Sequence, residues 1–307
     1  MSKLADTPPT AAALDALAYP ALFSAADGTS RTGQAWYTGF VRADLILVVC
    51  AAALTAASGI QAVVPPTAAI VLRGISVAML VLALVARTTN RVRRPEREWF
   101  DGRAVAESAK TTTWKYMMRT QPYDGDDSEA DGQLLSDFRS LIQDRRALPY
   151  ATAILTHGGE QITPRMRAVR SMPWQDRRDL YVAQRVQDQE RWYAGKAQAS
   201  RTAAAAWFWV GWLAQGAALG LSIVSLVVQT LPNVIGVLTS VAAAATGWTQ
   251  LRRHDELAQS YAVAAQELSL SASELSSAPD EAAFLKGVQQ AEDSISREHK
   301  LWVARRQ

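Results

Sequence analysis

Fifty consecutive residues without an ionisable side chain constrain this sequence more than any other feature. Residues 202–251 contain no Asp, Glu, Lys, Arg or His, so the 32 basic and 29 acidic residues of the chain all lie outside this stretch. About 20 apolar residues in a helix span a bilayer core of about 30 Å. The stretch therefore predicts two membrane-spanning helices rather than the core of a soluble domain.

Two pairs of spanning helices are predicted along the chain. Pro65 and Pro66 interrupt the first long apolar run and leave a short connection, which predicts an antiparallel hairpin. Pro232 suits the first turn of the last helix of the second pair. The sequence thus predicts an all-α membrane protein with two tandem transmembrane helical hairpins and cytoplasmic helical extensions. The predicted spans are 45–64, 67–86, about 205–228 and 232–248.

The positions of the basic residues predict the orientation in the membrane. Both hairpin tips are uncharged, whereas arginine and lysine collars flank the opposite ends of the spans, within 87–97, 196–201 and 252–253. Basic flanks face the cytoplasm, so both termini are expected there. These collars explain the net charge of +3 without a nucleic-acid partner and predict the lipid bilayer as the partner surface.

Breaks in the helical pattern divide the chain into three predicted parts. Residues 1–33, rich in Ala, Thr and Ser, are expected to be loosely ordered. Residues 34–148 are expected to form a first two-transmembrane unit with cytoplasmic helices. Residues 149–307 are expected to form a second such unit that ends in a helical hairpin.

Extra-membrane helices are predicted between and after the hairpins. Residues 96–119 and 133–146 have helical patterns on either side of an acidic break at 124–131, and one long helix is expected from Pro173 into the third span. Thr163 and Pro164 form an expected N-cap and first-turn pair.

The C-terminal region carries two apolar stripes of the coiled-coil type. Within 257–275 and 284–302, the stripe positions recur at intervals of four and three residues. The Ala278–Pro279 break between them predicts that the two helices fold back on each other. Stripes this narrow also leave room for helices of another subunit.

Motifs around the two predicted hairpins resemble those of a known family. Residues 99–110 follow the first hairpin, 162–170 and 188–193 precede the second, and Glu292 with 296–302 stands near the end. In this order they are similar to the SLATT proteins, two-transmembrane effector domains associated with bacterial nucleotide-signalling conflict systems. The resemblance covers about residues 20–307 and is to versions that fuse two different SLATT units in tandem.

The resemblance implies a multi-pass protein of the bacterial inner membrane. Its expected function is that of a pore-forming or membrane-perturbing effector of a conflict or antiphage-defence system. It also implies a trigger, either a nucleotide signal or a sensor protein. The motif residues are not catalytic in this family, so no catalytic residue is assigned.

The motifs that identify common enzymes and cofactor sites are missing from the sequence. There is no Walker loop, G-x-G-x-x-G, G-x-S-x-G or H-E-x-x-H, and a single cysteine with three scattered histidines excludes a Cys-rich zinc site. Asp127, Glu129 and Asp131 are spaced as in a calcium loop, but Phe138 stands where a bidentate Glu is needed. We therefore expect no enzymatic activity, cofactor or metal.

Arg73 is the only charged residue inside a predicted span. It lies about seven residues, or roughly 10 Å, from the outer end of its helix. A side chain of this length can reach the interface, which is the favoured interpretation. In an oligomer, a ring of these arginines would instead favour anions near an outer mouth.

The third span carries a polar face beside a small-residue face. A polar stripe in an apolar helix either bonds to a neighbouring helix, the commoner case, or lines water. Small residues four apart allow two helices to approach closely, within one chain or between chains. The polar stripe comprises Gln215, Ser222, Ser225 and Gln229; the helix-contact residues are Gly216 and Gly220, with Gly236 and Ser240 in the fourth span.

Two functions from different classes remain after these arguments. Four spans enclose little water, so a pore requires several copies, and the leading hypothesis is a homo-oligomeric pore-forming effector. The alternative is a non-conducting membrane scaffold or sensor that recruits partners through its cytoplasmic coiled-coil-like helices.

Overall fold

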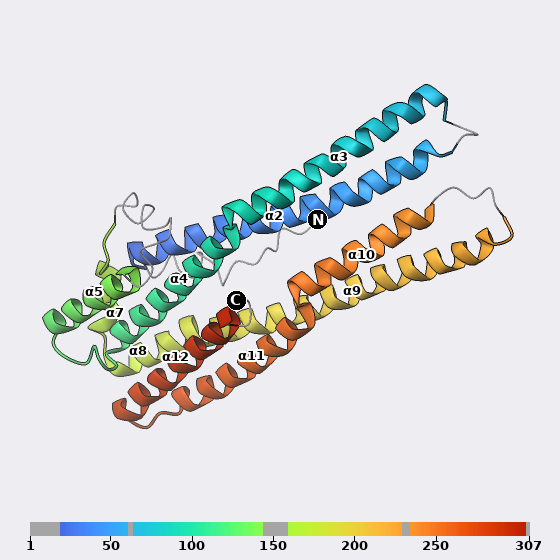
Figure 1. The fold of residues 1–307 in the computed structure, drawn as a ribbon. Coiled ribbons are helices and arrows are strands. Elements are labelled where there is room, and N and C mark those ends of the chain that lie inside the picture. The colour runs from blue at the N-terminus through green and yellow to red at the C-terminus, as the bar shows by residue number, and fades with distance from the viewer. Residues whose placement is uncertain (1–18, 61–63, 144–158, 229–233, 305–307) are drawn as a thin grey trace. The chain divides into compact units, whose positions relative to one another are not determined.

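The computed structural model is built from long helices (Figure 1). It describes residues 19–60, 64–143, 159–228 and 234–304, with side chains up to Ser296. Within these ranges there is no strand, and four helices are long and apolar enough to cross a membrane. The prediction of an all-α membrane protein is confirmed.

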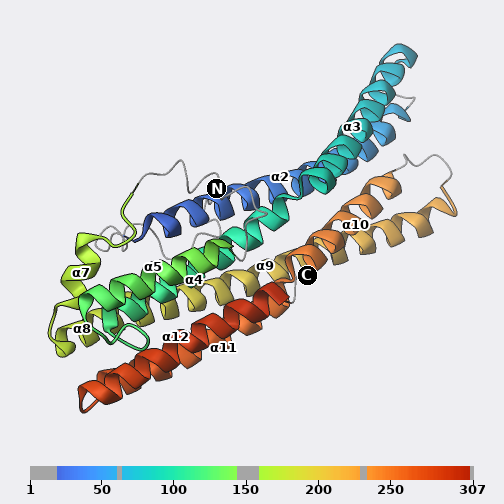
Figure 2. The same ribbon diagram turned by 60° about the vertical axis from the view of Figure 1, so that its left-hand side comes forward.

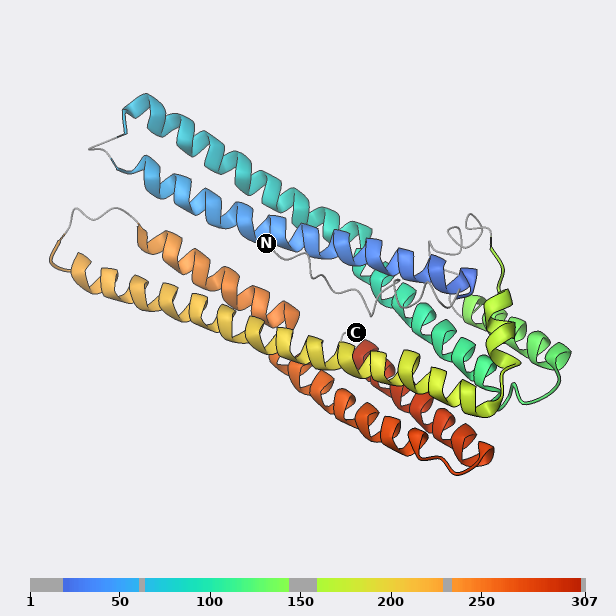
Figure 3. The same ribbon diagram turned by 180° about the vertical axis from the view of Figure 1, so that it is seen from behind.

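The first hairpin pairs α2 (Ala21–Ser58) with α3 (Pro66–Arg93), which run antiparallel side by side in Figures 1 and 3. Pro65 is the N-cap of α3 and Pro66 its first residue, where the missing N–H costs no hydrogen bond. At the other end, Arg94 adopts a left-handed conformation (φ 49°) and its N–H donates to the carbonyl of Asn90 at 3.1 Å. This residue ends α3 directly before the next helix.

The start of α2 differs from the sequence prediction. Residues 21–33, which composition predicts to be loosely ordered, form its first turns. The reason is a close approach to α4 (Pro95–Met118): a Cβ on Gly33 would lie 2.6 Å from the backbone nitrogen of Trp99, and one on Gly102 would lie 2.9 Å from that of Ser30. Two glycines far apart in sequence therefore allow two backbones to touch and fix this segment.

The acidic segment is also more helical than predicted. The break expected over 124–131 ends at α5 (Asp127–Gln143), which starts six residues before the predicted helix. The side chain of Asp126 accepts a hydrogen bond from the backbone N–H of Glu129 at 2.9 Å, as an N-cap does, and acidic residues in a first turn favour the helix dipole. Residues 127–131 therefore belong to a helix and not to the predicted break.

The helix expected from Pro173 into the third span is present. It comprises α8 (Trp174–Tyr181), a π-helical segment η1 (Val182–Val186) and α9 (Gln187–Ser225), which follow one another without a break. The preceding α7 (Pro164–Arg170) has Thr163 as its N-cap, and the Thr163 hydroxyl accepts from the N–H of Met166 at 3.2 Å. The predicted cap pair is confirmed.

The second spanning pair consists of α9 and α10 (Val234–Arg252), which lie side by side in Figures 1 and 3. Pro232, predicted in the first turn of α10, lies outside the described residues. Arg253, at φ 47°, separates α10 from α11 (His254–Ser276), and α12 (Glu281–Ala304) returns antiparallel to α11 (Figure 2). The predicted C-terminal hairpin is present.

The helices form two compact units, and the two halves of the chain contribute to both. The membrane unit comprises residues 35–94 and 197–259, and the extramembrane unit comprises 1–34, 95–196 and 260–307. Neither unit corresponds to one contiguous half of the sequence.

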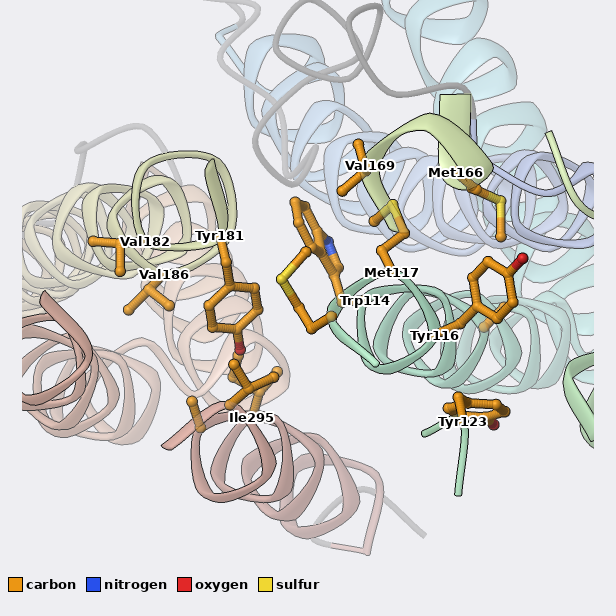
Figure 4. Packing of buried hydrophobic residues seen from close by; sticks show 14 of the residues in the cluster. Trp114, Tyr116, Met117, Tyr123, Met166, Val169, Tyr181, Val182, Val186 and Ile295 are labelled. Carbon is orange, nitrogen blue, oxygen red and sulfur yellow. The ribbon is translucent and has the colours of Figure 1, made fainter. Parts of the chain in front are cut away.

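Aromatic and aliphatic side chains from α4, α7, α8, η1 and α12 contribute to the core of the extramembrane unit (Figure 4). Trp114 is fully buried, packs edge-on against Tyr181 with ring centroids 5.5 Å apart, and donates its Nε1–H to the hydroxyl of Tyr19 at 2.9 Å. The stripe residues of the C-terminal hairpin join the same core. Buried stripe residues are Ala264, Leu268, Leu275, Phe284, Val288, Ala291 and Ile295.

Candidate functional site

Hydroxyl groups join the two helices of the first hairpin inside the membrane unit. The hydroxyl of Ser76, which is buried, donates to the carbonyl of Ala51 at 2.9 Å and lies 2.8 Å from the hydroxyl of Thr55. Hydrogen bonds between membrane helices stabilise their pairing because an unpaired polar group in hydrocarbon is costly. This cluster fixes α3 against α2.

Arg73 lies on α3 and is exposed in the single chain. Its Nε donates to the hydroxyl of Ser58, the last residue of α2, at 3.3 Å, and Ser58 in turn donates to the carbonyl of Thr55 at 2.8 Å. The guanidinium thus extends toward the turn that connects the two helices. A positive charge at this position is available either to the membrane–water interface or, in an oligomer, to the outer mouth of a pore.

Only two residues of the polar stripe on α9 have side-chain hydrogen bonds described within the chain. Ser222 and Ser225 are half-buried and donate to carbonyls of their own helix, those of Ala218 and Ser222, each at 2.7 Å. Gln215 is exposed, and Gln229 lies outside the described residues. The structure therefore does not bring the three described side chains of the stripe together against a neighbouring helix of the same chain.

The small residues of α9 divide between two faces. Ala214 and Ala218 are buried, and a Cβ on Gly211 would lie 3.8 Å from that of Ala245 on α10, so this face packs on α10. A Cβ on Gly216 or Gly220 would meet nothing within 4 Å. These two predicted helix-contact residues lie on a face that the chain itself leaves uncovered.

The predicted contact residues of α10 are placed differently. Gly236 and Ser240 are half-buried, and the Ser240 hydroxyl donates to the carbonyl of Gly236 at 2.7 Å. The chain therefore covers Gly236 and Ser240 of α10 in part, whereas it leaves Gly216 and Gly220 of α9 exposed.

A buried ion pair lies in the core of the extramembrane unit, where the sequence analysis assigned no site. The Glu292 carboxylate, fully buried on α12, accepts four hydrogen bonds: two from Arg185 (2.8 and 2.7 Å), one from Thr111 (2.8 Å) and one from Tyr181 (3.0 Å). Arg185, on η1, is 1% exposed. A buried ion pair offsets the cost of desolvation when the arginine binds both carboxylate oxygens and other donors complete the hydrogen bonds of the carboxylate, as they do here.

A signal for this pair was present in the sequence. Glu292 follows Val288 by four residues and precedes Ile295 by three, so it lies on the apolar stripe of α12. A carboxylate on a buried stripe needs a cationic partner. Arg185 was the harder residue to find, because it is 107 residues away in the sequence.

Arg170 forms a second buried cationic site that the sequence analysis did not assign. It is 2% exposed and donates to the carbonyls of Tyr116, Tyr123 and Gly125 at 2.8–2.9 Å and to the carboxylate of Asp127 at 2.9 Å. The hydrogen bond from Arg170 lowers the pKa of Asp127. One side chain thus holds the connection between α4 and α5.

Two carboxylates of the acidic segment, those of Asp127 and Asp131, already have cationic partners. Asp131 pairs with Arg167 at 2.7 Å and accepts from the hydroxyl of Tyr116 at 2.6 Å. Within the described residues, no group of three or more His, Cys, Asp or Glu side chains is arranged to hold a metal ion. The calcium-loop pattern therefore does not correspond to a convergent ligand set in this part of the chain.

Lys110 lies in the same core with 5% of its surface exposed. Burial lowers its pKa to about 8, and the positive charge of Arg185 acts in the same direction. Glu107 and Glu292 oppose the shift but do not cancel it. Lys110 is therefore a destabilising charge at neutral pH.

Comparison with protein families gives two matches, in tandem. Residues 20–178 match the family described as SMODS and SLOG-associating 2TM effector domain 3, and residues 181–302 match effector domain 1 of the same series. Comparison with curated proteins and with solved structures gives no match. Thr111 belongs to the first matched region and Arg185 and Glu292 to the second, so the buried network joins the two.

Replacing Glu292 with Ala is expected to destabilise the extramembrane unit strongly, because Arg185 would remain buried without its counter-ion. Breaking a buried pair costs about 3–5 kcal/mol, which is roughly a 10 °C lower Tm for a protein of this size. Thermal unfolding of the full chain in detergent, followed by tryptophan fluorescence, measures it. Glu274→Ala, an exposed carboxylate on α11, is the control. A double variant, Arg185→Met with Glu292→Met, should lose much less than Glu292→Ala, and an equal loss would contradict the charge argument.

Lys110 is expected to make stability depend on pH between about 8 and 9.5. Its folded pKa of about 8 lies below its ordinary value of 10.5, so in this range the unfolded chain binds a proton that the folded chain has lost. The free energy of unfolding therefore rises with pH, by at most about 1.4 kcal/mol per unit, and levels off below about pH 7. Unfolding midpoints measured from pH 7 to 9.5 test this.

Lys110→Met should remove this slope and raise the Tm at pH 7. Lys286→Met, at an exposed position on α12, should keep the slope. A slope that persists in Lys110→Met would assign the pH dependence to another group.

Proposed function

We propose that this chain, which belongs to the family of SMODS and SLOG-associating two-transmembrane effector domains, acts as an oligomeric effector that opens a path through the membrane. The observation that carries the proposal is the uncovered face of α9. Gln215, Gly216 and Gly220 lie in an apolar spanning helix, and the chain covers none of them.

The chemistry of this face favours another protein surface or water over lipid. A glutamine side chain in hydrocarbon loses hydrogen bonds, which makes polar residues in spanning helices expensive and usually functional. Two glycines four residues apart let another helix approach closely, whereas lipid gains nothing from them. Contact between copies through Gly216 and Gly220 would give the glycines a closely packed helix. It would also place Gln215 at the edge of a water-filled path, where its side chain keeps its hydrogen bonds.

The number of spans supports assembly from several chains. Four spanning helices pack with little enclosed water, so an aqueous path requires more than one copy. The hydroxyls of Ser222 and Ser225 donate hydrogen bonds to carbonyls of their own helix. Both side chains are therefore polar but uncharged, with a satisfied donor, and suit the wall of such a path. Arg73, held toward the turn of the first hairpin, then lies near one mouth.

The charge pattern and the family support a proposal for the location and the trigger. We place both termini in the cytoplasm of a bacterial cell and the spans in the inner membrane, because the arginine and lysine collars lie at the ends of the hairpins away from the tips. The family description associates these domains with SMODS and SLOG domains. We therefore propose a nucleotide signal or its sensor protein as the trigger in phage defence or a related conflict.

The scaffold alternative has less support from the packing. Its partners were expected to bind the apolar stripes of the C-terminal hairpin. Leu268, Val288 and Ile295 of these stripes are buried within the chain's own core, so they offer little surface to a partner.

Replacing Gln215 and Ser222 together with leucine is expected to abolish single-channel current steps, because both groups that contact water in the path become apolar. Conductance of the purified protein in planar bilayers, with and without candidate nucleotides, measures this. Native mass spectrometry checks that the variant still assembles. Thr239→Leu, an exposed hydroxyl on α10, is the matched control and should conduct normally. Unchanged current in the double variant would remove these residues from the path.

Arg73→Leu is expected to shift permeability from anions toward cations by severalfold, because a ring of positive charge near a mouth concentrates anions. Reversal potentials in asymmetric KCl measure the shift. Arg91→Leu, near the other end of the same helix, removes an equal charge away from the turn and should change the reversal potential less. Equal shifts in the two variants would contradict a specific role for Arg73.

A further inference from the structure

The membrane unit contains a cavity of about 610 Å³ bordered by α2, α9 and α10. Its walls are mainly apolar, with Val49 from α2, Val210 from α9 and Val241 from α10 among the lining residues. The volume lies in the range of pockets that hold a sizeable small molecule. The cavity is distinct from the uncovered face of α9 that carries the proposed function.

One end of this cavity is cationic. Arg42 of α2 and Arg252 of α10 both line it, and their guanidinium carbons lie 5.3 and 5.6 Å from the ring centroid of Trp248. The same indole thus orients two arginines from different hairpins. The other lining residues of α2 extend from this end to Cys50, eight residues further, which corresponds to about 12 Å along the helix.

Arg42 differs from a neighbouring arginine in its surroundings. Arg87 donates two hydrogen bonds to Asp44, at 3.2 and 2.9 Å, so a carboxylate balances its charge. Within the described residues, Arg42 makes no ion pair and is exposed beside Trp248. Its charge is therefore available to an anion at the mouth of the cavity.

A polar cationic end and a long apolar interior match one class of ligand, an amphiphile with an anionic head and a hydrocarbon tail. The cationic end lies at the ends of the spans, because Arg42 precedes the predicted span 45–64 and Arg252 follows the predicted span 232–248. Basic pockets between spanning helices at this depth suit the phosphate of an anionic lipid. A water-soluble anion would satisfy the arginines but leave the apolar walls unfilled.

We propose that this cavity is a binding site for an anionic phospholipid of the surrounding bilayer. The phosphate lies between Arg42 and Arg252, and one acyl chain enters along Val49 and Val241. The site joins the first hairpin to the second through a lipid. It depends on the membrane fold and not on whether the protein conducts.

The test measures which lipid the full-length protein retains. The protein is reconstituted into nanodiscs containing equal amounts of phosphatidylcholine and phosphatidylglycerol, released in mild detergent and analysed by native mass spectrometry. Retention of phosphatidylglycerol at several times the level of phosphatidylcholine is expected. Equal retention of the two lipids would overturn the assignment of the arginines.

Two pairs of variants separate the head from the tail. Arg42→Gln should reduce the preference for phosphatidylglycerol at least threefold, whereas Arg91→Gln, which removes a charge from the same basic region but not from the cavity, should not. Ala244→Phe fills the cavity and should lower retention of both lipids, whereas Ala243→Phe, on an exposed face of the same helix, should not. Indistinguishable members of either pair would overturn the corresponding contact.

A further arm distinguishes a lipid site from an anion site. Inorganic phosphate at 10 mM, added to the detergent-released protein, should leave the bound phosphatidylglycerol in place, because it cannot replace the acyl chain; about 10 mM far exceeds what is needed to occupy a typical weak anion site. Displacement of the lipid by phosphate would overturn the proposed position of the tail. Tryptophan fluorescence of each variant confirms that it is folded.

Discussion

The carboxylate of Glu292 is the group on which the extramembrane unit depends. It reaches across the core from α12 to η1, α8 and α4, and each of its hydrogen bonds comes from a different side chain or a different atom of Arg185. A charge buried this deeply is stable only while its donors stay in place. The Arg185–Glu292 pair therefore contributes specificity, because its hydrogen bonds form in one arrangement of these helices and other arrangements are destabilised.

The membrane unit is held by weaker and more local means. Hydroxyls join α2 to α3, and alanine faces join α9 to α10. Small polar groups and small apolar side chains allow close packing of spanning helices.

Much of this fold could be predicted from the sequence because the signals are local. The length of the apolar segments defines the spans, Pro65 and Pro66 define a turn, and the apolar stripes of the C-terminal hairpin predict its buried residues. The first turns of α2 could not be predicted this way, because they depend on Gly102, 69 residues beyond Gly33. Likewise, periodicity identified a glycine face on α9 but could not show that α10 packs on a different one.

The candidate sites follow the same division. Arg73 was evident as a lone charge in an apolar segment, whereas the Arg185–Glu292 pair and the cavity beside Trp248 combine residues from distant parts of the chain. Glu292 left a local signal as a carboxylate on the apolar stripe of α12, but no local pattern identifies its partner or the cavity. They become visible only when the helices that carry them are placed together.

Because both halves of the chain contribute to each compact unit, the tandem fusion has a consequence for assembly. Two separate polypeptides would combine in proportions set by their expression, and mixtures of like hairpins would compete with the intended pairing. Covalent linkage fixes equal numbers of the two hairpin types in every particle. Any larger assembly then grows by whole chains, so its composition is independent of gene dosage and its smallest repeating element is already asymmetric.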